Sequence, residues 1–264
     1  MTRKFLLVVC ALIVQTALFS QENPLIQTPS ISPDGSQIAF SYQGDIWTRA
    51  VDGTNLKRLT IHEAYDSNPI WNHDGSKLLF SSDRFGNNDI FVVGAKGGTP
   101  QRITYHSAAD LVTDVTNDGT VYISTSRNFR QLEREGEVHT VSIKGGTPFR
   151  ALSTLGFDAR LSPNKKFVVL TKGTCRIDRE AYKGPANRDI WLYDIANDNY
   201  IQLTTFDGQD FSPYWANNET IYFQSARSGR YNIHKLTIDA SGNKTGSIEQ
   251  VTQYTSMGIN TFHV

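Results

Sequence analysis

The chain has 264 residues, of which 39% are hydrophobic and 11% aromatic, so it carries enough apolar side chains to bury a sizeable core. Lys and Arg together number 26, and so do Asp and Glu. Because neither sign is in excess, the composition gives no reason to expect nucleic acid or an anionic membrane surface as a partner.

The chain begins with a segment typical of a signal peptide, residues 1–20. Two basic residues near the start precede an apolar run over residues 5–19, and Ser20 offers a small residue at a cleavage point. We therefore expect an exported protein, periplasmic or secreted, that does not span the membrane after cleavage; an uncleaved anchor is the alternative. Cys175 would then be the remaining cysteine, and a single thiol forms no internal disulfide.

The mature part of the chain is built from a repeated unit, clearest between residues 68 and 104. This unit contains four short strand-like runs separated by turns rich in Gly, Asn and Asp. Glycine supplies positive φ at such corners, and Asn and Asp side chains bond to the turn backbone. The four runs are residues 69–71, 77–81, 89–93 and 101–104.

Three markers of this unit recur in the same order. The turn after the first strand recurs at residues 34–35, 74–75, 118–119, 164–165 and 218–219. The third strand opens at Asp45, Asp89, Glu137, Asp189 and Asn232. The fourth strand ends at Thr60, Thr104, Ser153, Thr204 and Thr252. A four-stranded unit with a period of roughly 40–50 residues indicates a β-propeller.

The sequence therefore predicts an all-β fold, a β-propeller of four-stranded antiparallel blades that occupies residues 21–264 as one domain. Five complete blades are expected at about residues 28–66, 67–110, 111–158, 159–210 and 211–258, and the first strand of a sixth at residues 259–264. Because the rest of that sixth blade is missing, we expect a truncated piece of a longer protein with an exposed apolar edge and a tendency to aggregate.

No catalytic constellation is recognisable, and no catalytic residue, cofactor or metal ligand is predicted. The sequence has no Gly-x-Ser-x-Gly elbow, no His-Glu-x-x-His and no Gly-rich phosphate loop that opens a helix. Its six histidines are scattered, without the spacing of a zinc site. Asp34, Asp74 and Asp118 stand in Asp-Gly turns, where we expect them to bond to the turn backbone rather than to a metal.

One acidic residue recurs just after the fourth strand and would lie at the mouth of the central channel. On one interpretation these acidic residues form a ring of negative charge that attracts a cationic group, such as a peptide amino terminus. The structural alternative, which we favour, is that each Asp accepts hydrogen bonds from backbone or from an Arg of a neighbouring blade. The candidate channel-mouth peptide contacts are Asp66, Asp110, Asp158, Asp210, Arg84 and Arg227. His62 and His106 lie in the same connection and are expected to be structural.

The loop between the second and third strands lengthens in two units. It spans residues 127–136 in the third unit and roughly 172–188 in the fourth, and both stretches are rich in Arg and Glu. Charged insertions on one face of a repeat array are usual at a binding face, whereas a solvated loop that tolerates length is the alternative. Both interpretations stay open.

Several segments resemble a known family. Residues 31–40, with Asp45-Ile46-Trp47 and Arg58-Leu59-Thr60, resemble the WD-like repeat of the TolB and tricorn propellers. The segment 189–194 and the start of the mature chain look most like exported tricorn-type serine peptidases of Gram-negative bacteria, and the resemblance covers about residues 23–264. Units four and five depart from it, since Asn164-Lys165 and Asn218-Glu219 replace Asp-Gly.

The resemblance implies a six-bladed first propeller that is non-catalytic and gates or binds peptides for a serine peptidase domain absent from this chain. Peptides or unfolded polypeptide are the partners so implied, and homo-oligomerisation of the full-length protein is left open. Two alternatives remain. One is a TolB-like envelope scaffold that binds proteins, although TolB proteins carry a small α/β domain before the propeller and only residues 21–27 are available for it here. The other is an accessory propeller of an exported prolyl-oligopeptidase-like or amidohydrolase enzyme.

Overall fold

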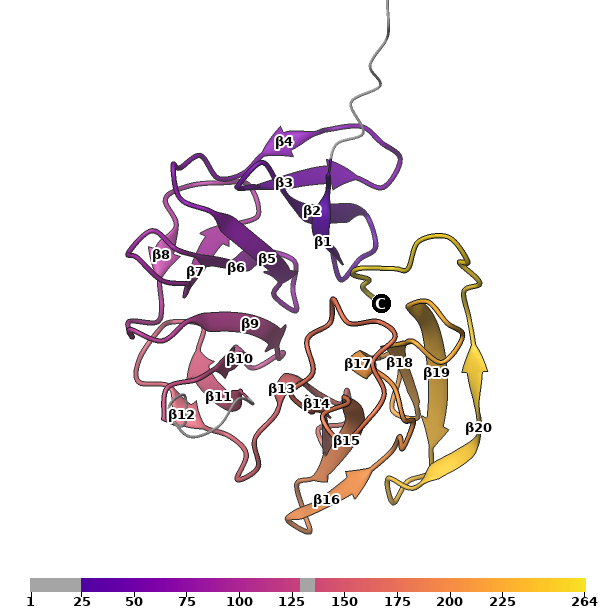
Figure 1. Cartoon of the computed structure of the whole chain (residues 1–264). Helices are drawn as coiled ribbons and strands as arrows, with labels where there is room; N and C mark the ends of the chain where they lie inside the picture. Colours follow the sequence, from indigo (N-terminus) through magenta and orange to yellow (C-terminus); the bar gives the residue numbers. More distant parts are fainter. Residues whose placement is uncertain (1–24, 129–135) are drawn as a thin grey trace, which may run out of the picture.

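A computed structural model describes residues 25–128 and 136–264 of the chain. The predicted signal segment, residues 1–20, lies outside the described residues, as does most of the insertion in the third unit. The described parts of the chain contain twenty strands and no helix, arranged as five four-stranded sheets around a centre (Figure 1). The predicted all-β propeller with five complete blades is confirmed.

Each sheet is one blade, in which four consecutive strands form an antiparallel meander. Blades 1 and 2 consist of β1 (Gln27–Ile31), β2 (Gln37–Tyr42), β3 (Asp45–Ala50), β4 (Lys57–Arg58), β5 (Asp66–Trp71), β6 (Lys77–Ser82), β7 (Asp89–Gly94) and β8 (Gln101–Arg102). Blade 3 consists of β9 (Asp110–Val115), β10 (Thr120–Thr125), β11 (Glu137–Ser142) and β12 (Phe149–Arg150). Blades 4 and 5 consist of β13 (Phe157–Leu161), β14 (Phe167–Lys172), β15 (Asp189–Asp194), β16 (Asn199–Gln202), β17 (Asp210–Trp215), β18 (Thr220–Ser225), β19 (Asn232–Ile238) and β20 (Lys244–Gln250).

The turns between the first two strands of blades 1 to 4 form as the sequence predicts. Asp74 Oδ1 accepts a hydrogen bond from the Ser76 backbone N at 2.8 Å, and Gly75 has a φ of 70°. Asp34 and Asp118 make the same turn-backbone bonds in blades 1 and 3. In blade 4, where Asn164-Lys165 replaces Asp-Gly, Asn164 accepts the equivalent bond and Lys165 has a positive φ of 60°. In blade 5 the acceptor is Asn217, one position earlier, and no residue of 216–219 has a positive φ. The turn geometry therefore survives the change of residue in blade 4 but differs in blade 5.

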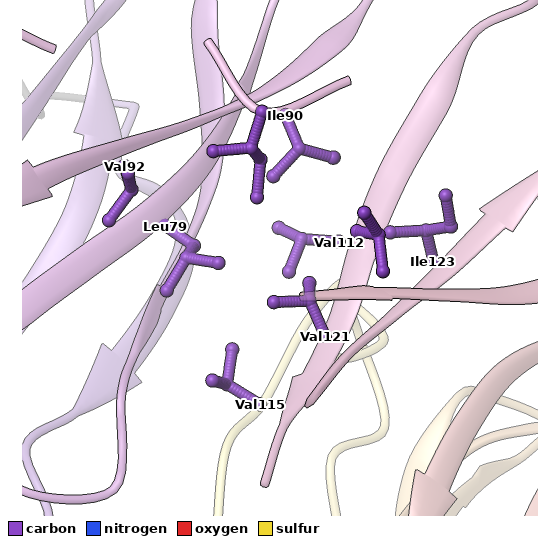
Figure 2. Close-up of a cluster of buried hydrophobic side chains, with 9 residues drawn as sticks. Leu79, Ile90, Val92, Val112, Val115, Val121 and Ile123 are labelled. Carbon is purple, nitrogen blue, oxygen red and sulfur yellow. The ribbon is translucent and has the colours of Figure 1, made fainter. Parts of the chain in front are cut away.

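The hydrophobic core lies between successive blades rather than at the centre of the ring. Between blades 2 and 3, Leu79 and Ile90 pack against Val112 and Val121, and Figure 2 shows these side chains facing one another. Equivalent clusters of buried residues join blade 1 to blade 2, blade 3 to blade 4 and blade 4 to blade 5. A blade buries its faces only against neighbours, so these interfaces supply most of the hydrophobic stabilisation.

The ring is not closed by contact between its first and last blades. The inner strands pack in succession, β1 on β5, β5 on β9, β9 on β13 and β13 on β17. No comparable packing joins β17 to β1 in the described ranges. The last residues of the chain lie in this sector, where Phe262 and His263 contact the Tyr214 ring and His263 Nε2 lies 3.5 Å from Ser30 Oγ.

The described residues form the five predicted blades, but not the predicted first strand of a sixth. Residues 259–264, where the sequence suggested the first strand of a sixth blade, form no strand. A strand exists through hydrogen bonds to a neighbouring strand. The backbone here bonds to blade 5 instead: the Ile259 N donates to Tyr231 O at 2.8 Å, and Gln224 Nε2 donates to Ile259 O at 2.5 Å.

Candidate functional site: the central channel

The inner strands of the five blades surround a channel that contains two adjoining cavities. One cavity has a volume of about 520 Å³ and the other about 560 Å³. Ile70, Arg160, Tyr214 and His263 line both, so these side chains form the boundary between the two. Volumes of this size fall in the range of ligand sites in proteins. The channel is therefore the candidate binding site.

Arg160 forms a bridge across the channel at this boundary. It belongs to β13 of blade 4, yet its Nη1 donates to the Thr113 carbonyl in blade 3, and its Nε donates to the Pro213 carbonyl in blade 5 at 3.0 Å. Its guanidinium lies over the Tyr214 ring, 3.6 Å from the centroid. One side chain thus connects three blades and narrows the passage between the two cavities.

A bulge in the inner strand places one residue of each of four blades at the wall of the channel. The residues have positive φ, between 46° and 54°, and all four line the 520 Å³ cavity: Thr28, Asn68, Asp158 and Ser212. An extra residue at a bulge redirects a side chain out of the regular alternation of a strand. In three of these blades the bulged residue precedes a proline, at Pro29, Pro69 and Pro213. That recurring proline was the signal in the sequence that would have identified three of the four residues; Asp158 precedes Ala159 and carries no such signal.

Three of the predicted aspartates form buried ion pairs inside their own blades. Asp66, Asp110 and Asp210 begin the inner strands β5, β9 and β17, and their side chains are completely buried. Their partners come from the loop between the second and third strands of the same blade. The pairs are Arg84 Nη2 to Asp66 at 2.7 Å, Arg127 to Asp110, and Arg227 Nη2 to Asp210 at 2.5 Å.

The same three residues also join one blade to the next through their backbone. The backbone N of Asp66 donates to Gly44 O at 2.8 Å, and that of Asp110 donates to Asn88 O at 2.7 Å. The backbone N of Asp210 donates to Arg188 O at 2.9 Å. Each acceptor belongs to the preceding blade. The sequence suggested that each Asp accepts hydrogen bonds from backbone or from an Arg of a neighbouring blade. The Arg partner instead belongs to the same blade, and backbone hydrogen bonds make the connection between blades.

Burial has a clear electrostatic effect on one of these carboxylates. Removal from water raises the pKa of Asp210 to about 6, and the Arg227 guanidinium acts in the opposite direction.

Five of the six predicted peptide contacts do not line either cavity: Asp66, Asp110, Asp210, Arg84 and Arg227. A peptide contact through them remains a prediction, and it would require the ion pairs to open.

Asp158 is not equivalent to the other three aspartates, contrary to the sequence alignment of the repeats. In blade 4 Phe157 pairs with Thr171, as Ser67 pairs with Ser81 in blade 2. The residue before Phe157 is Gly156, so Gly156 takes the place that Asp66 has before Ser67. The Gly156 backbone N accordingly donates to Gly136 O at 2.8 Å, as the aspartates do. Asp158 lies two residues further on, at the bulge. It is partly exposed and lines the 520 Å³ cavity.

Sequence reasoning missed Arg188, the last residue of the long loop of blade 4, although it had placed that loop on the channel face. Arg188 lines the same cavity as Asp158, and its guanidinium lies over the Phe157 ring, 4.5 Å from the centroid. Burial raises the pKa of Asp158, whereas the charges of Arg160 and Arg188 act to lower it. The rest of the loop packs on blade 5, where Glu180 pairs with Arg230 Nη1 at 2.9 Å.

The histidines in the blade connections have structural roles. His62 Nδ1 accepts a hydrogen bond from the Ala64 backbone N at 2.9 Å, and His106 Nδ1 accepts the same bond from Ala108. Within residues 25–128 and 136–264 no three His, Cys, Asp or Glu side chains are grouped so that they would hold a metal ion. The described part of the chain also has no helix with the length and apolar character of a membrane span.

Residues 23–264 match the protein family described as the tricorn protease N-terminal β-propeller domain. The chain is 23% identical to tricorn protease homolog 1 of Streptomyces coelicolor over 79% of its own length and 20% of that protein. It is 25% identical to the tricorn protease of Thermoplasma volcanium over 75% of its length and 24% of that protein. The chain therefore spans about a quarter or less of the length of these curated relatives.

Solved structures show the same fold. The tricorn protease crystal structure superimposes with a TM-score of 0.74 at 18% identity, covering 88% of this chain and 23% of that one. TolB from Acinetobacter baumannii superimposes with a TM-score of 0.66 at 15% identity, covering 87% of this chain and 55% of that one. Likeness at these identities is evidence of the shared propeller and not of a shared activity.

Proposed function

Because this chain belongs to the family of tricorn protease N-terminal β-propeller domains, we propose that it is the non-catalytic propeller of an exported tricorn-like serine peptidase, in which it binds or gates peptides. The peptidase activity itself would belong to other parts of a longer protein. Export would depend on residues 1–20. Purification of the protein from its host and determination of the mature amino terminus tests that part, with Gln21 as the expected first residue.

The central channel is the observation that carries this proposal. Each inner strand has a neighbour on one side within its blade, so its other edge faces the channel. Some backbone groups of this edge are bonded across blades, as the Thr113 and Pro213 carbonyls are to Arg160, and the remaining ones could pair with an extended peptide. The two cavities, of about 520 and 560 Å³, give room for short stretches of peptide. A chain of sequence-independent backbone contacts suits a protein that handles many different peptides.

Arg160 supplies the means of gating. It holds the boundary between the cavities through bonds to two carbonyl groups and a contact with the Tyr214 ring. A peptide that crosses from one cavity to the other has to displace this side chain. Since the bonds of the guanidinium are to neutral carbonyl oxygens, displacement breaks no ion pair with a contacting carboxylate.

Blocking the channel tests the function. We would measure binding of fluorescein-labelled, unstructured peptides by fluorescence anisotropy, using the protein and a Leu111→Trp variant. Leu111 lies in β9 and lines the 520 Å³ cavity, so the larger indole would occupy the channel. The matched control is Leu56→Trp, because Leu56 is 60% exposed and lies outside both cavities.

The expected result is a loss of affinity of about tenfold or more for Leu111→Trp and no change for Leu56→Trp. Exclusion of a ligand from its buried site removes most of its contacts, which is worth more than the ~1.4 kcal/mol that corresponds to tenfold. Equal binding by the two variants would show that peptides bind outside the channel. Absence of peptide binding to the unmodified protein would overturn the proposed function and would favour the alternative, a scaffold that binds folded proteins.

A further inference from the structure

Arg188 is fixed in position by three hydrogen bonds that use its backbone and one atom of its side chain. Its backbone N donates to Gln209 Oε1 at 3.3 Å, and its carbonyl accepts from the Asp210 N at 2.9 Å. Its side-chain Nε donates to the Cys175 carbonyl at 2.7 Å. These bonds join the end of the blade 4 loop to blade 5 and hold the guanidinium at the channel wall.

The outer nitrogens of this guanidinium make no hydrogen bond to the residues that the structure describes. No hydrogen bond from Nη1 or Nη2 and no ion pair to Arg188 is present in the described residues, and the side chain lines the 520 Å³ cavity. Its plane lies near two aromatic rings, with the Phe157 centroid at 4.5 Å and the Phe211 centroid at 5.8 Å. Two donors of a fixed fork therefore face a cavity whose nearby walls are aromatic.

Neither of the other charged side chains of the cavity, Arg160 and Asp158, forms an ion pair or hydrogen bond with Arg188 in the described structure. Arg160 has the same sign and is occupied by the carbonyl groups of Thr113 and Pro213. Asp158 has the opposite sign, but no ion pair joins it to Arg188 in the described structure; its carboxylate is 3.5 Å from Ser212 Oγ. Burial lowers the pKa of Arg188, whereas the charge of Asp158 acts to raise it.

We propose that Arg188 binds a carboxylate group of a peptide held in the channel. This inference rests on the proposed peptide-binding function and adds a specificity to it. The carboxylate is either the peptide carboxy terminus or an Asp or Glu side chain. A guanidinium and a carboxylate form two parallel hydrogen bonds, and the pair is stronger in a cavity shielded from water. The bond from Nε to the Cys175 carbonyl and the contact with the Phe157 ring restrict the guanidinium, which reduces the entropy lost when the ligand binds.

Three peptides of one neutral, unstructured sequence distinguish the sources of the carboxylate. The first has a free carboxy terminus and no acidic side chain, the second a carboxy-terminal amide and one Glu, and the third an amide and no acidic residue. Fluorescence anisotropy measures the dissociation constant of each, with an uncharged BODIPY label in place of fluorescein because fluorescein itself carries a carboxylate. At least one acidic form should bind about tenfold more tightly than the neutral form, and the stronger of the two identifies the source.

Two substitutions in the channel should have opposite effects on binding of the acidic peptide. Arg188→Gln removes the charged fork and should weaken binding about tenfold or more, to the level of the neutral peptide. Asp158→Asn removes a negative charge from the same cavity and should strengthen binding several-fold. The control is Arg176→Gln, since the Arg176 side chain is 80% exposed and pairs with Asp178 outside the channel. If Arg188 had only a structural role, the two substitutions would not change the affinity for the acidic peptide in opposite directions.

Each outcome decides the proposal. Selective binding of an acidic peptide that is lost in Arg188→Gln and enhanced in Asp158→Asn supports it. Equal binding of all three peptides by the unmodified protein overturns it while the proposed function stands. Binding of none of the peptides overturns the proposed function, and the carboxylate site with it. If Arg188→Gln does not fold, Arg188→Lys and Asp158→Asn still test the proposal, because lysine keeps the charge but loses the paired bonds and should bind with intermediate affinity.

Discussion

The buried ion pair of blade 2 allows a quantitative test of how the blades are stabilised. Asp66 is completely buried, and its carboxylate accepts from Arg84 Nη2 at 2.7 Å and from Nε at 3.4 Å. The Arg84 side chain is 12% exposed and lies over the Phe80 and Phe91 rings. Arg84→Met keeps most of the apolar stem over those rings and removes the charge. Asp66 is then left buried beside no cation.

Breaking a buried ion pair by removal of one partner costs about 3–5 kcal/mol, because the remaining charge is left without compensation. Replacement of both partners by apolar residues of similar size is often neutral. We therefore expect Arg84→Met to lower the free energy of unfolding by about 3–5 kcal/mol. The double variant Asp66→Leu with Arg84→Met should cost less than Arg84→Met alone. For a chain of this size the single change corresponds to a fall in Tm of roughly 6–20 °C.

Urea denaturation of the two single variants and the double variant measures the coupling between the residues. The control is Arg176→Met, whose ion pair with Asp178 has side chains that are 80% and 57% exposed. Such an exposed pair contributes about 0–1 kcal/mol. If Arg84→Met cost no more than this control, or if the costs of the two single changes simply added, the buried pair would not be the element that stabilises blade 2.

Three further predictions concern the turns, the core and pH. Lys165 has a φ of 60° in the turn of blade 4, a conformation that costs roughly 1–2 kcal/mol for a residue with Cβ. Lys165→Gly should therefore raise the free energy of unfolding, measured by urea denaturation, by about 1 kcal/mol, and a decrease would contradict this reasoning. Leu79 is completely buried between blades 2 and 3, so Leu79→Ala should lower that free energy by about 2–5 kcal/mol, and a change below 1 kcal/mol would show that the interface repacks. Burial lowers the pKa of His263 from 6.5 to about 4, so the unfolded chain binds a proton there that the folded chain does not, and the contribution of His263 to stability should fall as pH falls from about 6.5 to 4. The raised pKa of Asp210 acts in the opposite direction in both proteins, so the test is the comparison with His263→Phe: between pH 7 and pH 5 the unmodified protein should lose on the order of 1–2 kcal/mol relative to this variant, and equal changes in the two proteins would refute the assignment to His263.

Much of the fold follows from local sequence. The turn after each first strand is specified by a side chain that bonds to its own backbone, as Asp74 does to Ser76, and this holds even where Asn164 replaces Asp. The identity of each strand and the number of complete blades follow from the repetition of such turns. The ion pairs could also have been anticipated, because an Arg follows Asp66, Asp110 and Asp210 by 17 or 18 residues in each case.

The register of blade 4 could not be predicted from the acidic residues. The sequence suggested that Asp158 continues the series of Asp66, but strand pairing places Gly156 there and puts Asp158 on the bulge. A shift of two residues leaves the alternation of a strand unchanged, so the hydrophobic pattern does not reveal it. Only pairing with β14 decides which residue enters the channel.

The sequence by itself thus determined the strands and turns of the blades, since each blade is formed by four consecutive strands that pair with their neighbours in the chain. The tertiary structure alone decided the channel, because its parts come from different blades. Arg160 crosses from blade 4 to carbonyl groups of blades 3 and 5, and Arg188 reaches the cavity from the end of a 16-residue connection between β14 and β15. No local pattern encodes where a loop end or a long side chain meets residues some fifty positions away. Those meetings depend on the packing of complete blades against one another, and they place the charged groups on which the proposed function depends.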